Sequence, residues 1–344
     1  MRRVFFCFIA TMKVSVLIPF LNAAATLEAA VASLFDQNFE DFDVILVDNG
    51  STDHSVRIAE TIAQKHANVI LVNEPRKSIA RALNTGLEFC SGEYIARMDA
   101  DDLALPGRLK FQCNYLDQHP ETGLVSGLVE FRSGMDNSEG MRSYTDQINR
   151  MTGRDEIRNF RFVESPFAHP SVMFRKKLMA LHGPYTEDPV PEDYELWLRW
   201  FDAGVIMDKP EVPVLIWNDH PERASRKSNH YSDQAFSHVR LNYLSRFLKQ
   251  SENFKKPIYI WGGGKLSRKK AEVLIGQGIR IDGFIDVNPD RKIEGFHVIH
   301  YLNVPPPENC LVVSLVSNRG RFREIADFLE SKGYRTGRNF IPAS

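Results

Sequence analysis

Three carboxylates stand close together in the first third of the chain, at Asp99, Asp101 and Asp102. They follow a short, mostly apolar run, residues 94–98, whose composition is typical of a buried strand. In extended backbone, side chains two residues apart project to the same side, so Asp99 and Asp101 should face the same space. Hard oxygen ligands suit Mn²⁺ or Mg²⁺ that also coordinates a diphosphate. The group indicates either such a cation site, for chemistry on a nucleotide-activated substrate, or a solvated acidic turn.

The elements that must position these acids alternate regularly. Strands are predicted over residues 14–19, 42–47, 69–72 and 94–98, and helices over 22–36, 55–65 and 78–90. This alternation predicts a parallel sheet with helices on both faces, in which ligands bind beyond the carboxyl ends of the strands. The loops that begin at Asp48 and Asp99 both follow strand ends, so we expect them on one rim of the sheet.

The rest of the chain suggests a second α/β domain. Residues 124–217 mix short elements irregularly, and a predicted helix over 232–248 precedes a polar stretch. Strands over 258–261, 281–285 and 311–315 then alternate with helices over 266–275 and 321–331. We therefore expect a disordered leader at residues 1–12, a first domain at 13–248, a linker at 249–257 and a small Rossmann-like domain at 258–344.

Composition argues against several classes of protein. The 344 residues carry a net charge of −1, without the basic excess typical of nucleic-acid binding. The four cysteines have no C-x-x-C spacing, which argues against a zinc site or a disulfide framework. The apolar run at residues 4–10 is too short to span a bilayer. We expect a cytoplasmic protein, with peripheral attachment to the inner face of the cell membrane as a minor alternative.

A series of motifs in a fixed order resembles one known family. The motifs are residues 16–22, 47–53, 82–86 and 92–102, then Pro106, Arg108 and Gln112, and finally residues 169–171 and 192–193. Together they resemble the family 2 glycosyltransferases, inverting enzymes of the GT-A fold, over about residues 13–220. The resemblance implies a mixed or parallel α/β sheet flanked by helices. It also implies metal-dependent transfer of a hexosyl group from a nucleotide-sugar to a hydroxyl.

The resemblance also implies roles for particular residues. Those expected to bind the nucleotide-sugar are Pro19, Phe20, Asn22, Asp48, Arg81, Asp99 and Ala100; Asp101 and His220 would bind the metal, and His169 would lie on the acceptor side. A carboxylate only accepts hydrogen bonds, so Asp48 suits the imide N–H of a uracil base. This favours a UDP-sugar as the donor.

Several neighbouring residues keep two interpretations. Asn49 stands where many family members carry a second aspartate, which leaves the choice of base open. Asp53 could cap the following helix or contact the ligand directly, and Asp102 could be a structural cap or a support for the site. Arg223 and Arg226 would either brace the diphosphate or be solvated.

Asp193, with Glu192 beside it, is the predicted catalytic group. Inversion proceeds by one in-line displacement, in which a carboxylate takes the proton of the acceptor hydroxyl. Such a base contributes roughly 10²–10⁴ in rate. The charge of Glu192 could raise the pKa of Asp193. Without the resemblance, both acids would be interpreted as charges favoured at a helix N-terminus.

A glycine turn marks the predicted second domain. Gly262–Gly264 follows a strand and precedes a helix, as in dinucleotide-binding turns, and Asp286 stands where an acidic ribose ligand would. Ser267 replaces the third glycine of that pattern. Residues 283–289 resemble the N-terminal domain of bacterial sugar O-acyltransferases, which implies sugar-nucleotide binding. A structural or assembly role is the alternative.

We therefore predict a metal-dependent inverting glycosyltransferase of bacterial surface polysaccharide or glycolipid biosynthesis. Its partners would be a nucleotide-sugar, expected to be a UDP-sugar, and a glycan or lipid-linked acceptor. One alternative is a nucleotidylyltransferase, although residues 23–25 are alanines where such enzymes carry a glycine-rich phosphate loop. The other is a non-catalytic sugar-nucleotide-binding protein, for which Asp193→Asn would change nothing measurable.

Overall fold

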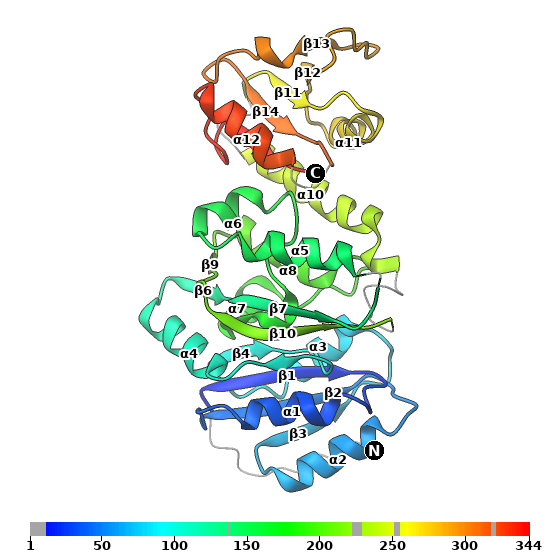
Figure 1. Ribbon diagram of the computed structural model, residues 1–344, viewed down its shortest axis with the longest axis vertical. Coiled ribbons are helices and arrows are strands. Elements are labelled where there is room, and N and C mark those ends of the chain that lie inside the picture. Colours follow the sequence, from blue (N-terminus) through cyan, green and yellow to red (C-terminus); the bar gives the residue numbers. More distant parts are fainter. Residues whose placement is uncertain (1–11, 137, 222–228, 251–254, 318–320) are drawn as a thin grey trace. The chain divides into compact units, whose positions relative to one another are not determined.

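The computed structural model describes residues 12–136, 138–221, 229–250, 255–317 and 321–344 (Figure 1). These residues form two compact units. The first takes in the described residues up to Arg154, with Phe167–Leu196 and Ala203–His230; the second takes in Asp155–Pro166, Trp197–Asp202 and the described residues from Tyr231 to Ser344. The predicted leader lies outside the described residues except for residue 12. Helix α10, Asp233–Gln250, extends into the predicted linker 249–257, and the domain limits stay a prediction.

A mixed seven-stranded sheet forms the centre of the first unit, as the sequence predicts. Its order is β3-β2-β1-β4-β8-β6-β9. The strands are β1 Val14–Phe20, β2 Phe42–Asp48, β3 Val69–Asn73, β4 Tyr94–Arg97, β6 Thr122–Val125, β8 Met173–Arg175 and β9 Ile206–Asp208. Strands β1 to β4 run parallel, β8 is antiparallel to both β4 and β6, and β9 is parallel to β6. All residues of β1 and β2 are buried, because parallel strands are covered on both faces.

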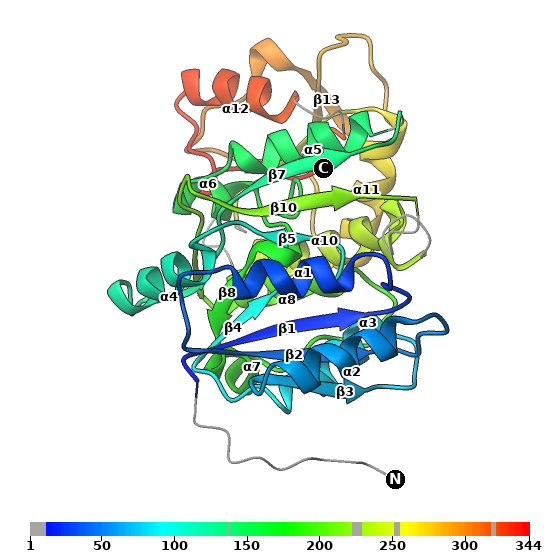
Figure 2. The same cartoon turned by 60° about the horizontal axis from the view of Figure 1, so that its bottom comes forward.

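Three helices connect the first four strands: α1 Leu27–Phe35, α2 Ser55–Lys65 and α3 Ile79–Leu87. Helix α1 packs against α2, and α3 packs on β1 and β2, as the turned view in Figure 2 helps to follow. The predicted start of the first helix at residue 22 is wrong. Asn22 has a φ of 53°, outside the right-handed helical region, and its side chain accepts a hydrogen bond from the Thr52 N–H at 2.8 Å.

A second, three-stranded sheet of the first unit has the order β5-β10-β7. Its strands are β5 Leu103–Ala104, β7 Leu128–Ser133 and β10 Pro213–Asp219. In the antiparallel pairing of β10 with β5, Ile216 lies opposite Leu103. Because β5 directly follows the acidic loop, the residues that follow Ile216 run back alongside residues 99–102.

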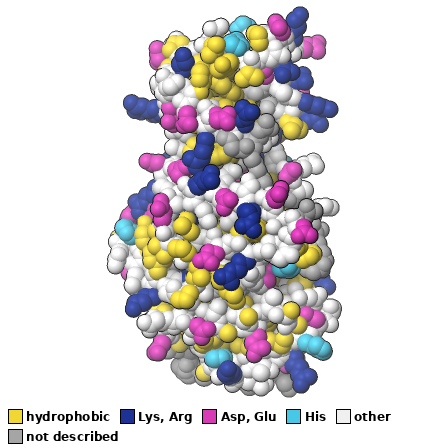
Figure 3. Space-filling view, in the orientation of Figure 1, with side chains coloured by type: hydrophobic (Ala, Val, Ile, Leu, Met, Phe, Trp, Pro, Cys, Tyr) yellow, Lys and Arg dark blue, Asp and Glu magenta, His cyan; other side chains and the backbone are white. Residues whose placement is uncertain are grey.

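Among the described residues, five more helices lie between β5 and β9. They are α4 Arg108–Gln118, α5 Glu139–Asn149, α6 Arg154–Phe160, α7 Lys177–His182 and α8 Glu192–Asp202, with 3-10 turns at His169–Ser171, Asn229–Tyr231 and Tyr301–Asn303. No helix in the described part of the chain is long and apolar enough to cross a membrane. On the face seen in Figure 3, basic and acidic side chains are intermixed, in keeping with the net charge near zero.

The second unit contains a five-stranded parallel sheet of order β13-β12-β11-β14-β15. Its elements are β11 Ile258–Trp261, α11 Lys265–Gly276, β12 Gly283–Asp286, β13 His297–His300, β14 Leu311–Ser314, α12 Arg321–Ser331 and β15 Phe340–Pro342. The sequence predicted three of these strands and missed β13 and β15. The two apolar residues of β13 lie between two histidines and the strand is only partly buried, while β15 is apolar and buried but has only three residues, too few to show a pattern. The likeness to acyltransferase domains stays a prediction.

Candidate active site

The ends of β1, β2 and β4 bring two loops to one edge of the central sheet. Phe20, the last residue of β1, lies opposite Asp48 at the end of β2, and Leu17 lies opposite Arg97 at the end of β4. The loop after β2 and the acidic loop after β4 therefore leave the sheet on the same rim. Both belong to the first unit.

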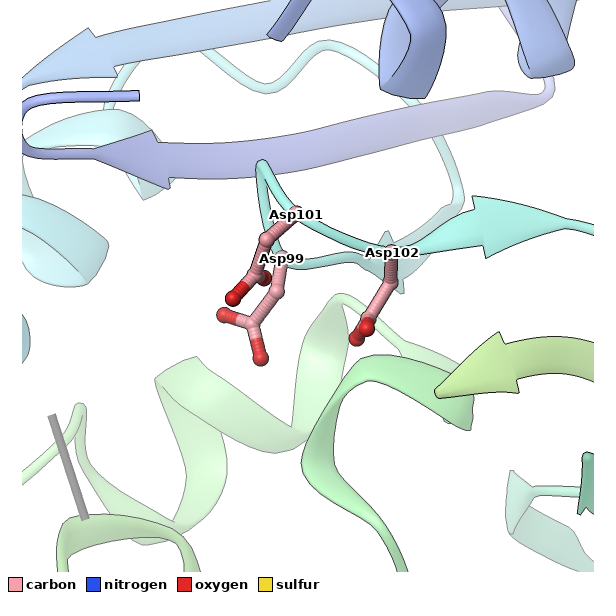
Figure 4. A group of neighbouring side chains, drawn as sticks. All are labelled: Asp99, Asp101 and Asp102. Atoms are coloured by element: carbon pink, nitrogen blue, oxygen red, sulfur yellow. The ribbon is translucent and has the colours of Figure 1, made fainter. Parts of the chain in front are cut away.

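The three aspartates after β4 form a compact group. One oxygen atom from each of Asp99, Asp101 and Asp102 lies within 4.8 Å of the others. Figure 4 shows the carboxylates of Asp99 and Asp101 side by side, with that of Asp102 to one side. The group offers the oxygen donors that a divalent cation prefers, and hydrogen-bond partners distinguish the roles of Asp101 and Asp102.

Asp101 lies next to His220, the residue that follows β10. The distance from His220 Nε2 to Asp101 Oδ2 is 2.6 Å. Neighbouring ligands of an octahedral cation bound at about 2.1 Å lie about 3 Å apart, so small movements would let both atoms bind one ion. Carboxylate oxygens suit Mg²⁺ and Mn²⁺ alike, and an imidazole nitrogen favours the transition metal of the two. The residues present therefore fit a divalent cation.

Asp102 has a supporting position. It is 1% exposed, and its Oδ1 accepts a hydrogen bond from the Asn218 N–H at 2.8 Å. Asn218 Nδ2 in turn donates to the backbone carbonyl of Asp101 at 2.7 Å. These two bonds fasten the acidic loop to β10 and hold His220, two residues further on, near Asp101.

The loop after β2 is held against the end of β1. Asp48 is 5% exposed, and its Oδ1 accepts a hydrogen bond from the Ser51 N–H at 3.0 Å. The Asn22 N–H donates to Ser51 Oγ at 3.0 Å, while Asn22 Oδ1 accepts from the Thr52 N–H. Asn22 and Asp48 therefore shape one loop on the rim that also holds the acidic group.

Asn49 has a structural function that its amide explains. Its Nδ2 donates to the carbonyls of Glu74 and Arg76 at 3.0 and 2.9 Å, and its Oδ1 accepts from the Ser78 N–H at 2.9 Å. A carboxylate could accept from Ser78 but could not donate to two carbonyls. Asn49 therefore fastens the connection from β3 to α3 rather than acting as a second acid.

The other residues predicted for the nucleotide-sugar lie around the same rim. Pro19 and Phe20 are buried at the end of β1, and Ala100 is 7% exposed within the acidic loop. Arg81, on α3, forms an ion pair with Glu187. Pro19 and Phe20 therefore have little side-chain surface to offer a ligand.

Asp193 lies in the first turn of α8. Burial raises its pKa to about 6, against the hydrogen bond from the Tyr194 N–H and the charge of Arg97, which lower it. The Tyr194 N–H lies 2.7 Å from Asp193 Oδ1. Glu192, the preceding residue, is 3% exposed. A carboxyl group with a pKa just below neutrality is suited to act as a general base.

His169 lies near Glu192, the residue before Asp193. Its Nε2 lies 3.0 Å from the Tyr185 hydroxyl, and its Nδ1 lies 3.8 Å from Glu192 Oε1. Burial, with the charge of Arg97, holds the pKa of His169 well below its ordinary value. The ring is therefore neutral at physiological pH, lies within hydrogen-bond distance of the Tyr185 hydroxyl and is close to Glu192 without bonding to it at this distance.

Asp53, Arg223 and Arg226 each have two interpretations from the sequence. Asp53 Oδ1 accepts from the Ser55 N–H at 2.9 Å and Asp53 Oδ2 from the Ala24 N–H at 3.1 Å, which favours the capping interpretation. Arg223 and Arg226 lie outside the described residues.

In the second unit, Asp286 and the glycine turn contact each other. Asp286 Oδ2 accepts from the Gly263 N–H at 2.7 Å and lies 3.5 Å from Arg291 Nε. A Cβ atom on Gly263 would lie 2.7 Å from the same oxygen. The acid therefore supports the turn, which favours the structural interpretation of this motif.

Sequence reasoning gave no role to Arg97, Tyr185 or Asn218. Arg97 carried a signal, because it is the one charged residue of β4, whose four residues are all buried. Tyr185 and Asn218 had none, since both reach the site only through long-range packing.

Comparison with known proteins agrees with this architecture. Residues 15–181 match the family model described as Glycosyl transferase family 2. Amylovoran biosynthesis glycosyltransferase AmsE of Erwinia amylovora is 30% identical over 254 residues, which cover 71% of this chain and 90% of that protein. The chain therefore belongs to glycosyltransferase family 2.

Solved structures show the same fold at low identity. TarS of S. aureus, solved as residues 1–349 with UDP-GlcNAc, has a TM-score of 0.52 at 18% identity, over 70% of this chain and 68% of that one. The mannosyltransferase PcManGT of Pyrobaculum calidifontis, solved with GDP-Man and Mn²⁺, has a TM-score of 0.50 at 20% identity, over 70% of this chain and 64% of that one. The likeness supports a GT-A fold.

Proposed function

We propose that this glycosyltransferase is an inverting, metal-dependent enzyme that transfers a sugar from a UDP-sugar to a hydroxyl acceptor in surface polysaccharide or glycolipid biosynthesis. The observation that carries the proposal is the meeting of Asp101 with His220 on the rim that also holds Asp48, in the unit that contains Asp193. Relatives support it in part: AmsE is named for amylovoran biosynthesis, and the two solved structures contain nucleotide-sugars.

Asp193 is the proposed general base. With a pKa of about 6 it is mostly ionised at pH 7, so it can take the proton of the acceptor hydroxyl as that oxygen attacks the anomeric carbon. Attack on the face opposite the leaving nucleoside diphosphate inverts the anomeric configuration. Neutral His169 would hold the Tyr185 hydroxyl by a hydrogen bond on the acceptor side, which is the role expected for it.

Asp101 and His220 would hold the cation, whose charge would offset that of the departing diphosphate. Asp99, 26% exposed at its side chain, would contact the ribose or the sugar, and Asp48 would accept from the base. Ala100, Asn22, Arg81, Pro19 and Phe20 complete the proposed nucleotide-sugar rim. Glu192 would assist Asp193 through its adjacent charge.

The first experiment measures thermal stabilisation by UDP-, GDP- and TDP-sugars with Mn²⁺, Mg²⁺ or EDTA, together with slow donor hydrolysis. One donor should stabilise the protein only with the metal, and Asp101→Asn or His220→Ala should remove that effect. Asp146→Asn, an exposed acid on α5, is the matched control and should behave as the wild type. Stabilisation that persists in EDTA would reject metal dependence, and a preference for a GDP-sugar would reject the role given to Asp48.

Two competing functions predict different results. A non-catalytic sugar-nucleotide-binding protein would bind a donor but show no hydrolysis or transfer, and Asp193→Asn would change nothing. A nucleotidylyltransferase would release pyrophosphate from a nucleoside triphosphate and a sugar phosphate. The cytoplasmic location, and attachment to the inner face of the membrane, stay predictions.

A further inference from the structure

Arg97 is a buried cation at the end of β4. Its exposed fraction is 3%, and charged side chains are seldom buried so deeply unless they are paired. Its Nη1 lies 2.5 Å from Asp99 Oδ1, an ion pair formed two residues along the chain. The site therefore contains a fixed positive charge that the proposed reaction has not used.

Hydrogen bonds also hold the backbone of Arg97 in place. Its N–H donates to the carbonyl of Val172 at 3.0 Å, and its carbonyl accepts from Arg108 Nη2 at 2.7 Å. Arg108, itself 1% exposed, also donates through Nε to Gln112 Oε1 at 3.0 Å. Arg108 and Gln112 belong to the family-like motif, and the contacts suggest what they do: they hold the end of β4 in place.

The charge of Arg97 acts on four groups from three other segments of the chain. Its charge acts on Tyr185 and Glu192, and it lowers the pKa of His169 and of Asp193. Asp99, Glu192 and Asp193 are all acids, and like charges brought together out of water repel one another. A buried cation among them offsets that repulsion.

We propose that Arg97 is a positioning residue for sugar transfer, whose guanidinium holds Asp99 on the donor side by an ion pair and whose charge offsets those of Glu192 and Asp193 on the acceptor side. It acts through these acids and does not contact substrate. The catalytic consequence rests on the proposed function, whereas the link between Arg97 and Asp193 is a property of the folded chain alone.

The first test separates positioning from general stability. Arg97→Gln and Arg97→Lys are compared with Arg175→Gln, which removes another buried arginine, 8% exposed, from β8 opposite the start of β4. Arg175 donates to the carbonyls of Thr122, Leu116 and His119. We expect Arg97→Gln to lower kcat by roughly 10- to 100-fold, the range usual for residues that orient catalytic groups, with a smaller change in donor KM.

Arg97→Lys, which keeps the charge, should recover part of the lost kcat. Arg175→Gln should lower the unfolding midpoint while leaving kcat of the folded protein unchanged. If Arg97→Gln and Arg175→Gln both lower stability alone, Arg97 has no positioning role.

The second test does not depend on turnover. A double-mutant cycle combines Arg97→Gln with Asp193→Asn, and urea midpoints are measured for the wild type, both single variants and the double variant. Asp193→Asn should stabilise the Arg97→Gln background more than the wild type, since the carboxylate there has lost its cation. The same cycle with Arg175→Gln should be additive.

If the effect of Asp193→Asn on the urea midpoint adds to that of Arg97→Gln just as it adds to that of Arg175→Gln, Arg97 and Asp193 are not linked and the proposal is wrong. If the wild type turns over no donor, the proposed function fails while the cycle still decides whether Arg97 holds Asp193. If Arg97→Gln does not fold, Arg97→Lys replaces it in both tests, with a reduced coupling and a reduced loss of kcat expected.

Discussion

Asp193→Asn should make the protein more stable and inactive at the same time. In the folded state the pKa of Asp193 is about 6, above the ordinary value of 3.8. The folded protein therefore binds this proton more tightly than the unfolded chain does. The ionised carboxylate lowers stability above pH 6, and that penalty disappears as the pH falls toward 3.8.

The size of the effect follows from the same values. A difference of about two pH units between the two pKa values corresponds to about 3 kcal/mol, taken as an upper limit. Asparagine keeps an oxygen that can accept from the Tyr194 N–H, so the helix start should survive the change. It cannot take a proton from a hydroxyl, so turnover should fall by about two orders of magnitude or more.

The assay is urea unfolding at pH 7.5 and at pH 4, in EDTA, beside donor turnover at pH 7.5. Asp193→Asn should raise the free energy of unfolding at pH 7.5 by up to about 3 kcal/mol and should lose this advantage at pH 4. Asp146→Asn should change neither quantity. A variant that is less stable than the wild type at pH 7.5, or that keeps full turnover, would refute the reasoning.

Three further predictions use other parts of the site. The acid limb of kcat/KM in the wild type should fall with an apparent pKa near 6, because Asp193 must be ionised to act; a kcat/KM that stays flat down to pH 5 would contradict this. His220→Ala should weaken Mn²⁺-dependent donor binding, measured by calorimetry, by roughly 10- to 100-fold, and an unchanged affinity would remove His220 from the metal site. Asn49→Asp should lower the free energy of urea unfolding by about 1–3 kcal/mol, because the buried carbonyl of Glu74 and the partly buried carbonyl of Arg76 lose their donor; Asn49→Asp with wild-type stability would show that these bonds contribute little.

Local patterns were enough to predict most of the first sheet. Continuous apolar runs identify β1 and β2, and strand–helix alternation predicts their parallel pairing. Because parallel strands have their carboxyl ends at one edge of the sheet, the loops after β2 and β4 are expected on the same rim, where ligands bind. The pattern failed at Asn22, whose left-handed conformation and bond with the Thr52 N–H exclude it from the helix, and α1 begins at Leu27.

The sequence by itself determined which residues could do the chemistry, because residue type, spacing and motif order are local properties. It named Asp101, His220 and Asp193, but it could not show which of them meet. That depended on tertiary structure: the pairing of β10 with β5 brings His220 to Asp101, 119 positions away in the chain. The charge of Arg97 acts on Asp193 only because β4 and the start of α8 pack in one unit. No local pattern specifies such contacts, since each arises from the packing of separate segments.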